Sequence, residues 1–598
     1  MRSDSDNTAD PTTTESLLVE SAPVESAPVE SATVETVSGL RERRFLFAAI
    51  WVACVVFVCG LTIADPDLWG HTLYGMRANE QGTFAEAHDP FSYTAAGGDW
   101  VNHEWLSESQ FGWLWQRLGN AGLVAWRNAW CLVVFAVAFA ALKRSAASLP
   151  AAVLLLVLNA ETLSDFMVFV RPQMATFGIF ALYLYLLKRY WTQQRVGLLL
   201  PLPILMVLWV NHHGGFLAGL GVFGITVAAM ALQCLRTKTS WRPVLVAASV
   251  LCVTILATFV NPYGFGLHVM LWDHLWTPQF VREWQPLWSV SQSPVYYVPF
   301  LLTGLALCGS RRWTLMDALI LAVVAWEAVS HVRHVALFCV ATLVLLPEPL
   351  SDTLARLFPT IARQWSGHAR RPLRIAAVAS VILFLSVIHI RGSLKLWQKG
   401  ITPLSIAAET RSDVPGIPLG AISFIDSHKL SGNLLTDYGW GQYVIWHLHP
   451  RVRVGFDGRY RTVYPAAVER TFLDFQTLKR DGAADTPMLD SFGTDIVLLP
   501  NDRGPVEYME QRPDWQLVYR DSQASVFLHD TAEHQKLITR FKPQPARGNA
   551  LAVWTEFPAG PDSGGNDSRY EDVEVFARRA SPLGSIVEEP ETHQPSES

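Results

Sequence analysis

The fold of this chain is decided by Phe45-Leu-Phe-Ala-Ala-Ile-Trp-Val-Ala-Cys-Val-Val-Phe-Val-Cys-Gly-Leu-Thr-Ile63, which is followed directly by Ala64-Asp-Pro-Asp-Leu-Trp-Gly-His71. The first stretch is an apolar run close to the ~20 residues that a helix needs to cross a bilayer. The second stretch brings two carboxylates and an imidazole to the point where that run ends. Ionised side chains at a membrane surface are costly unless they pair, bind a ligand or face water, so this cluster is the first candidate site.

The composition supports a membrane protein. The chain has 598 residues, of which 50% are hydrophobic and 17% charged, and its mean hydropathy is +0.21. A soluble domain usually has about 25% charged residues. The net charge of -6 argues against a nucleic-acid partner, which would require a basic surface. The seven cysteines lie in apolar runs without the spacing of zinc ligands, so we expect neither disulfides nor a zinc site from them.

Further apolar runs of roughly spanning length follow the first one, and together they predict about eleven transmembrane helices. The runs cover residues 45–63, 121–142, 149–170, 174–187, 196–210, 215–235, 243–260, 294–309, 313–329, 334–347 and 373–391. Several of them are shorter than ~20 residues, so ten or twelve crossings also fit the sequence.

Lysine and arginine residues orient the predicted bundle, because cytoplasmic loops collect positive charge. Basic clusters precede the first run and recur in every second loop after it, which predicts a cytoplasmic N-terminus. The alternate loops are then outer loops. They contain the clusters Asp65-Pro-Asp67, Arg171-Pro-Gln173, Asn211-His-His-Gly214, Asn261-Pro-Tyr263 and His331-Val-Arg-His334. The polar clusters are therefore predicted to share one face of the membrane.

The chain divides into four predicted regions. Residues 1–40 hold a Val-Glu-Ser-Ala-Pro repeat that is too poor in large apolar side chains to form a core, which predicts a disordered cytoplasmic tail. Residues 41–392 form the multi-pass domain with a large first outer loop, 64–120. Residues 410–530 alternate strand-like and helix-like segments and include a predicted hairpin from Gln516 to Tyr519 and from Ser525 to His529. This pattern predicts an extracytoplasmic α/β domain with its own core. Residues 531–598 are rich in Pro, Gly, Ser and acids, which predicts a second disordered tail.

The loop 64–120 is too long for a simple connection, and such length usually indicates function. Helical periodicity over Leu68 to Asn79 and over Glu104 to Leu118, with several tryptophans, predicts two amphipathic helices in the plane of the membrane interface.

The acidic pair has two interpretations. If the first helix begins at Asp65, Pro66 is its first helical residue, and Asp65 then serves only as the N-cap. Asp67 and His71 then share a helix face, so the imidazole can hydrogen-bond the Asp67 carboxylate and orient it. We therefore favour Asp67 over Asp65 as a reacting group.

Other outer-loop residues are candidates for binding. Glu104 follows a histidine as in H-E-x-x-H, but Ser107 replaces the second histidine, so that zinc motif is absent. His212 and His213 could hold a metal or a sugar hydroxyl, and each of the arginines Arg171 and Arg333 could hold a phosphate in a bidentate way. The alternatives are a helix start for Glu104, solvated histidines, and arginines that reach towards lipid head groups.

An acidic base, outward cations and a tryptophan-rich loop together suit one reaction. An acceptor hydroxyl attacks a sugar whose leaving group is a lipid phosphate held in the bilayer. A carboxylate acts as the general base. Arginines, or a divalent cation such as Mg²⁺ or Mn²⁺, stabilise the departing phosphate.

The order of the motifs resembles bacterial members of the type-C (GT-C) glycosyltransferase superfamily over roughly residues 45 to 530. These proteins are related to the RgtA/B/C/D-like transferases, the protein mannosyltransferases and the catalytic subunits of oligosaccharyltransferases. The motifs are Asp65-Pro-Asp-Leu-Trp-Gly-His71, Asp89-Pro-Phe-Ser-Tyr-Thr94, His103-Glu-Trp-Leu106, Arg171-Pro-Gln173, Asn211-His-His-Gly214, Asn261-Pro-Tyr-Gly264, Glu283-Trp284 and Val454-Gly-Phe-Asp-Gly-Arg459.

This resemblance implies an inverting transfer from a polyprenyl-phosphate sugar to a glycan, lipid or protein acceptor, outside the bacterial cytoplasmic membrane. The implied catalytic group is Asp67, or Asp65 in its place. His71 and Glu104 accompany this acid pair. From the chemistry of the outer loops themselves, the candidates for binding the donor phosphate and the substrate are Arg171, His212, His213, Glu283, Arg333 and His334. Any metal would be held by Asp65 and Asp67, although their spacing departs from the superfamily's usual acid pair and leaves metal dependence open.

Two other classes of function fit parts of the sequence. A transporter or flippase of a lipid-linked or small substrate would also be polytopic, but it would place polar groups near the membrane midplane and often show internal repeats. A non-catalytic scaffold would use the α/β domain to bind a partner. In that case Asp457 and Arg459 would only form a turn and a salt bridge.

Overall fold

The computed structural model describes residues 37–84, 86–145, 147–276, 281–289, 293–360, 371–398, 400–410, 416–478, 486–541 and 553–559. The chain forms two units, residues 1–44 and 45–598. The predicted tail 1–40 lies outside the described residues except for Val37 to Leu40, which begin helix α1.

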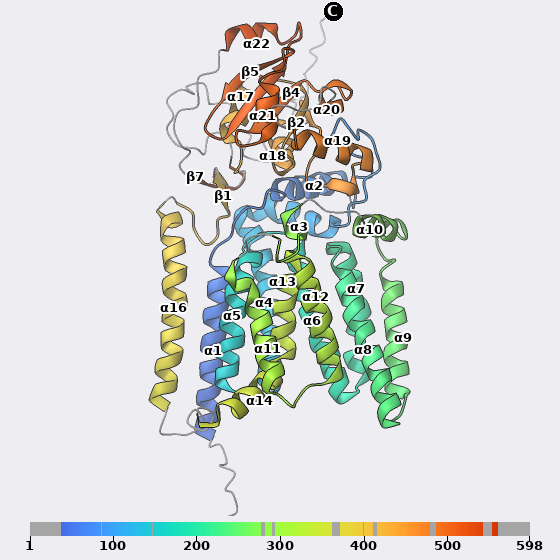
Figure 1. Ribbon diagram of the computed structural model, residues 1–598, viewed down its shortest axis with the longest axis vertical. Coiled ribbons are helices and arrows are strands. Elements are labelled where there is room, and N and C mark those ends of the chain that lie inside the picture. Colours follow the sequence, from blue (N-terminus) through green and yellow to red (C-terminus); the bar gives the residue numbers. More distant parts are fainter. Residues whose placement is uncertain are drawn as a thin grey trace, which may run out of the picture. The chain divides into compact units, whose positions relative to one another are not determined.

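Each predicted apolar run contains a described helix, and Figure 1 shows these helices side by side in one bundle. They are α1 (Val37–Cys59), α4 (Asn120–Arg144), α5 (Leu149–Met167), α6 (Gln173–Gln193), α7 (Pro201–His212), α8 (Phe216–Thr237), α9 (Arg242–Ala257), α11 (Val298–Gly309), α12 (Leu315–Ser330), α13 (Val335–Leu345) and α16 (Arg371–Trp397). Helix α13 lies inside the bundle, since all of its residues except Leu337 are buried. The seven cysteines are free.

The number of membrane crossings differs from the prediction. Among the described residues, four helices are long and apolar enough to cross a membrane. A fifth is reached if the bent pair formed by Val332–Leu345 and α14 (Pro347–Leu357) counts as one span. The predicted count of about eleven is therefore not confirmed, because several bundle helices are shorter than the ~20 residues of a full span.

Two short helices between α1 and α4 are the amphipathic helices predicted in the first long loop. They are α2 (Leu68–Gln81) and α3 (Trp105–Leu118), and Figure 1 shows them at one end of the bundle. We call this end the loop end. The two helices pack closely at two glycines. A Cβ atom on Gly75 would overlap the Glu108 carbonyl, and one on Gly112 would overlap the Gly75 backbone. Helix α10 (Gly266–Trp276) follows α9.

The C-terminal part contains the predicted α/β domain. Its five-stranded sheet has the order β3-β2-β4-β6-β5, with parallel pairing of β2 to β3 and β4, and antiparallel pairing of β6 to β4 and β5. The strands are β2 (Gly432–Thr436), β3 (Val452–Val454), β4 (Ile496–Pro500), β5 (Trp515–Arg520) and β6 (Ala524–His529). The helices are α17 (Leu419–Ser427), α18 (Tyr438–Leu448), α19 (Ala466–Gln476), α20 (Pro487–Asp490) and α21 (Gly504–Met509). The hairpin predicted between residues 516 and 529 is confirmed as β5 and β6.

The disordered tail predicted for 531–598 is wrong for its described residues. Helix α22 (Gln535–Arg540) follows the sheet, and strand β7 (Val553–Glu556) pairs antiparallel with β1 (Ala407–Thr410). The chain then returns to the loop end, where the Pro558 carbonyl accepts a hydrogen bond of 2.7 Å from Trp69 Nε1. The remainder of the predicted tail lies outside the described residues.

Candidate active site

The turn before α2 gives the two acids of the first motif different roles. Asp65 is buried, and its Oδ1 accepts a hydrogen bond of 2.8 Å from the Asp67 amide. Helix α2 begins at Leu68, so the predicted start at Asp65 and Pro66 is two residues early. Asp67 occupies the N-cap position, but its side chain makes no capping hydrogen bond. The N-cap predicted at Asp65 is therefore found at Asp67, and the Asp65 side chain instead accepts the Asp67 amide in the turn before the helix. The Asp67 carboxylate is uncommitted in the sense that it makes no capping hydrogen bond.

Arg171 connects Asp65 to a distant loop. Its Nε forms an ion pair with Asp65 Oδ2, and its Nη1 donates to Glu283 Oε1 at 2.6 Å. The Arg171 guanidinium holds the pKa of the Glu283 carboxyl below its usual value. The motifs of Asp65, Arg171 and Glu283 thus meet at the loop end, although more than 100 residues separate each one from the next. This agrees with the prediction that the polar motifs share one face of the membrane.

The surroundings of Asp67 make it a weaker acid than a free aspartate side chain usually is. Burial raises the pKa of Asp67 to about 6, against the lowering effect of the nearby His71, and the carboxylates of Asp457 and Glu283 raise it further. Part of this burial comes from the α/β domain, because a Cβ atom on Gly458 would overlap Asp67 Oδ1 and stand 3.0 Å from Asp67 Cγ. A carboxylate with a pKa near neutrality can accept a proton at physiological pH.

The predicted hydrogen bond between the side chains of His71 and Asp67 is absent from the contacts that the described residues make. His71 Nδ1 instead contacts Glu108 Oε1 at 2.8 Å, and its Nε2 faces Glu104 Oε2 at 3.9 Å. Glu108 is fixed in turn by a short hydrogen bond from Asn102 Nδ2. The carboxylates of Glu108, Glu104 and Asp67 outweigh burial and raise the pKa of His71 to about 9, so the ring is a cation at neutral pH.

Glu104 joins this network to helix α7. Its Oε1 lies 3.7 Å from His213 Nε2 and 3.8 Å from His103 Nε2. His213 Nδ1 accepts a hydrogen bond of 2.9 Å from the Gly215 amide, so the neutral ring carries its proton on Nε2, towards Glu104. Burial raises the pKa of Glu104 to about 7. Glu104 therefore exchanges its proton near physiological pH, beside a fixed N–H donor.

His212, the first histidine of the Asn211-His-His-Gly214 motif, contacts a backbone carbonyl and an aromatic ring. His212 Nδ1 donates to the Leu208 carbonyl at 2.7 Å, and the ring packs edge-on against Trp130. Its neighbour Asn211 accepts a hydrogen bond of 2.8 Å from Trp105 Nε1 and so holds α3 against α7. Unlike His213, His212 contacts no carboxylate among the described residues.

A cavity of about 310 Å³ adjoins Arg171 and Glu283 at the loop end. Its lining combines charged groups with aromatic ones and includes Asp165, Phe166, Phe169, Arg171, Glu283, Tyr296 and Arg333. The Arg333 guanidinium lies 4.4 Å from the centre of the Trp284 ring and forms no ion pair with a carboxylate of the described chain. His334 does not join this lining, because its Nδ1 faces Glu327 Oε2 at 3.2 Å.

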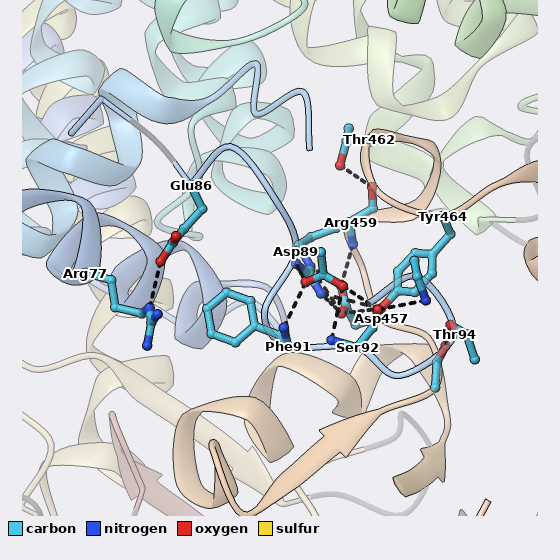
Figure 2. A network of polar contacts seen from close by, with 12 residues as sticks. Arg77, Glu86, Asp89, Phe91, Ser92, Thr94, Asp457, Arg459, Thr462 and Tyr464 are labelled. Atoms are coloured by element: carbon cyan, nitrogen blue, oxygen red, sulfur yellow. Dashed lines mark hydrogen bonds and ion pairs between the residues drawn. The ribbon is translucent and has the colours of Figure 1, made fainter. Parts of the chain in front are cut away.

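The α/β domain is fastened to the first long loop by a buried ion-pair cluster (Figure 2). Arg459 Nη1 pairs with Asp89 Oδ1 at 2.7 Å, and its Nη2 pairs with Asp457 Oδ2 at 2.7 Å. Tyr464 donates to the same Asp457 oxygen at 2.7 Å. The salt bridge considered for Asp457 and Arg459 is thus present, and it extends to Asp89. This cluster fixes the loop that contains Gly458.

Sequence reasoning missed several residues that the structure places at the site. Glu108 lies one helical turn after Glu104, and this spacing is the signal that could have identified it. Asp89 and Gly458 were visible only as parts of longer motifs, and no periodicity indicates that they approach Arg459 and Asp67. Such contacts join elements that lie hundreds of residues apart.

Asp65 Oδ1 accepts from the Asp67 amide and Asp65 Oδ2 pairs with Arg171, so a divalent cation shared by Asp65 and Asp67 would compete with both contacts. Two other groups in the described chain bring three potential ligand atoms within 4.8 Å of one another. They are His71 with Glu104 and Glu108, and Glu327 with His331 and His334. In the first group, the contact to Glu108 and the cationic ring account for His71 without a metal.

Solved structures of two membrane glycosyltransferases resemble this chain. The oligosaccharyltransferase of Archaeoglobus fulgidus in its apo form is 13% identical with a TM-score of 0.48, over 76% of this chain and 69% of that one. ArnT from Cupriavidus metallidurans bound to undecaprenyl phosphate is 14% identical with a TM-score of 0.47, over 83% of this chain and 99% of that one. Both belong to the type-C superfamily that the motif order resembles. No protein-family model and no curated protein matches the sequence.

Proposed function

We propose that this chain is a membrane glycosyltransferase that moves a sugar from a polyprenyl-phosphate donor to an acceptor hydroxyl, with Asp67 as the general base. One observation carries the proposal. The uncommitted Asp67 carboxylate is linked through the Asp65 turn and Arg171 to a cavity lined by arginines and aromatic rings. A base and a phosphate-binding pocket beside it are the two parts that the transfer requires.

The cavity suits a lipid phosphate better than a soluble nucleotide. Arg333 has no carboxylate partner in the described chain, so its guanidinium is available to a phosphate, which it can bind in a bidentate way. Phe166, Phe169 and Tyr296 supply an apolar wall of the same cavity. The guanidinium groups would bind the phosphate while the aromatic wall contacts the first units of the prenyl chain.

Every bond that forms or breaks in the proposed step is accounted for. The acceptor oxygen attacks the anomeric carbon of the sugar while Asp67 takes the hydroxyl proton. The bond from the anomeric carbon to the phosphate oxygen breaks, and its electron pair leaves with the lipid phosphate. Arg333 and Arg171 stabilise that charge. Attack from the side opposite the leaving group inverts the anomeric configuration.

The remaining candidate residues have supporting roles. Glu104 and the Nε2–H of His213 face each other at 3.7 Å and offer an acceptor and a donor for sugar hydroxyls. Glu283 holds Arg171 through its ion pair. We place the reaction on the outer face of the bacterial cytoplasmic membrane, because Lys and Arg residues collect in the loops at the opposite end of the bundle.

The test compares a deletion strain complemented with the wild-type chain, Asp67→Asn, or the control Asp99→Asn. Asp99 is an exposed carboxylate in the same long loop. Mass spectrometry follows the polyprenyl-phosphate sugars and the envelope glycans at matched expression. A transferase predicts that the donor accumulates and one sugar residue disappears in the Asp67→Asn strain alone among the complemented strains. A wild-type profile with Asp67→Asn would exclude Asp67 as the base.

The same measurement distinguishes a transferase from a transporter. A transporter that uses the arginine-lined cavity would lose function with Arg333→Gln and retain it with Asp67→Asn. A transferase needs both side chains. Fractionation of the donor between the two membrane leaflets then shows whether the lipid is moved or consumed.

A further inference from the structure

A second group of chemically reactive side chains lies at the loop end of α12, apart from the Asp67 network. The sequence Glu327-Ala-Val-Ser-His331-Val-Arg-His334 spaces its Glu and His residues four and then three apart, which places them on one face of a helical segment. Helix α12 ends at Ser330, and the short helix η4 (Val332–His334) continues the turn. The break between these two helices turns both imidazoles towards the Glu327 carboxylate.

The distances in this group are short and convergent. Glu327 Oε2 lies 3.2 Å from His334 Nδ1 and 3.7 Å from His331 Nδ1. The three potential ligand atoms all lie within 4.8 Å of one another. Both Nδ1 atoms are shielded from solvent, and both face the same carboxylate oxygen of Glu327. One carboxylate oxygen can pair closely with only one of the two ring nitrogens, so a further group is needed to satisfy both of them.

An ion pair alone accounts poorly for this arrangement. One protonated histidine would satisfy the carboxylate, and the second ring would then add like charge beside the first. Two neutral rings beside one carboxylate avoid this repulsion. Neutral imidazole is the form that binds a metal ion.

We propose that Glu327, His331 and His334 bind one first-row transition-metal ion, with Zn²⁺ as the best fit. Two imidazoles and one carboxylate form a three-ligand set that leaves a fourth tetrahedral position open. Zinc bonds of about 2.0–2.1 Å place tetrahedral ligand atoms ~3.3 Å apart. The observed separations of 3.2 and 3.7 Å need only small side-chain adjustments to reach this value.

The metal would stiffen the turn that contains Arg333. Trp284 packs edge-on against His331, with ring centres 5.4 Å apart, and the Arg333 guanidinium lies 4.4 Å from the centre of the same Trp284 ring. Fixing His331 and His334 therefore fixes both flanks of Arg333. The metal site itself does not depend on the proposed transferase activity.

Metal binding is tested on the full-length chain in detergent, purified without a polyhistidine tag and stripped with a chelator. Zn²⁺ is added in small excess and then removed by gel filtration, and bound metal is measured by mass spectrometry. Co²⁺ replaces Zn²⁺ in a second titration, because its absorption spectrum reports nitrogen ligation and tetrahedral geometry. We expect one ion per chain. His331→Ala and Glu327→Gln should each weaken binding at least tenfold, the lower limit of losses when even an outer-shell partner is removed.

The controls use the other histidines of the chain. His88→Ala removes an exposed histidine and should leave the stoichiometry at one. Glu104→Gln alters the other three-ligand group and should also leave it at one. Absence of bound metal in the wild-type chain, or loss of metal in Glu104→Gln with retention in His331→Ala, would overturn the proposal. The melting temperature of each variant shows whether it is folded. If His331→Ala does not fold, Glu327→Gln still tests the proposal, because glutamine retains the shape and hydrogen-bonding capacity of the side chain.

Discussion

The backbone of Gly458 lies directly against the carboxylate of Asp67, so close that a single added Cβ atom would overlap Asp67 Oδ1. Gly458 belongs to the loop after β3 in the α/β domain, whereas Asp67 precedes α2 in the first long loop. The α/β domain therefore forms one wall of the candidate active site. This explains why the Val454-Gly-Phe-Asp-Gly-Arg459 motif contains glycine at that position.

Replacing Gly458 with alanine should impair the reaction more than the fold. The new methyl group must push Asp67 aside, and a displacement of about 1 Å at a reacting group can cost on the order of 100-fold in rate. We expect a loss of that order in donor consumption by purified membranes. Gly221→Ala is the matched control, because a Cβ atom there meets open space. Full activity of Gly458→Ala would show that the position of Asp67 does not affect the reaction.

Replacing Arg459 should destabilise the attachment of the α/β domain. Arg459→Met leaves Asp89 and Asp457 buried without their cation, and breaking a buried pair costs about 3–5 kcal/mol. Thermal unfolding in detergent should show a lower melting temperature, and limited proteolysis should cut the α/β domain earlier. Arg312→Met breaks an exposed pair with Glu348 and should cost no more than ~1 kcal/mol. Equal effects of the two substitutions would show that the buried ion-pair cluster of Arg459 stabilises the protein no more than an exposed pair does.

The transfer rate should fall on the acid side with a midpoint set by Asp67. Its pKa is raised to about 6, so the base form increases as pH rises through that value and is lost below it. The measurement is the pH dependence of kcat/KM with the donor found in the strain experiment. His71→Ala removes a cation that lowers this pKa, so the acid limb should move to higher pH.

A variant of Glu104 identifies the titrating group. Glu104 has a pKa raised to about 7 and could produce a similar limb. In Glu104→Gln the acid limb should remain, because Asp67 still titrates. Disappearance of the limb in this variant would assign it to Glu104 instead.

An ion pair between α6 and α12 should also be sensitive to single substitutions. Lys188 of α6 pairs with Asp317 of α12, and Asp317 has no exposed surface. Lys188→Met leaves that carboxylate unpaired and should cost about 3–5 kcal/mol of stability, seen as a lower melting temperature. The double variant Lys188→Met/Asp317→Asn should recover much of the loss, since neither charge remains. An additive double variant would argue against direct pairing.

Local periodicity was enough to predict the elements of this protein. Each apolar run contains a helix, the loop helices α2 and α3 lie where amphipathic spacing placed them, and the strands β5 and β6 lie where strand-like segments were predicted. Basic residues in alternate loops also predicted that the polar motifs share one end, and the contacts of Arg171 with Asp65 and Glu283 confirm it. These features depend on hydrophobicity and charge along short stretches, which the sequence displays directly.

The assignment of partners required the tertiary structure. The sequence could not show that Asp65 is committed to Arg171, that His71 pairs with Glu108 instead of the Asp67 side chain, or that Gly458 covers Asp67. Nor could it show that residues 553–556 return to pair with β1. An ion pair or close contact depends on distances between separately folded elements, and several acids and bases compete for each partner. The sequence alone determined which groups gather at the loop end, and only the packing of the helices and the α/β domain decided which of them remain free to react.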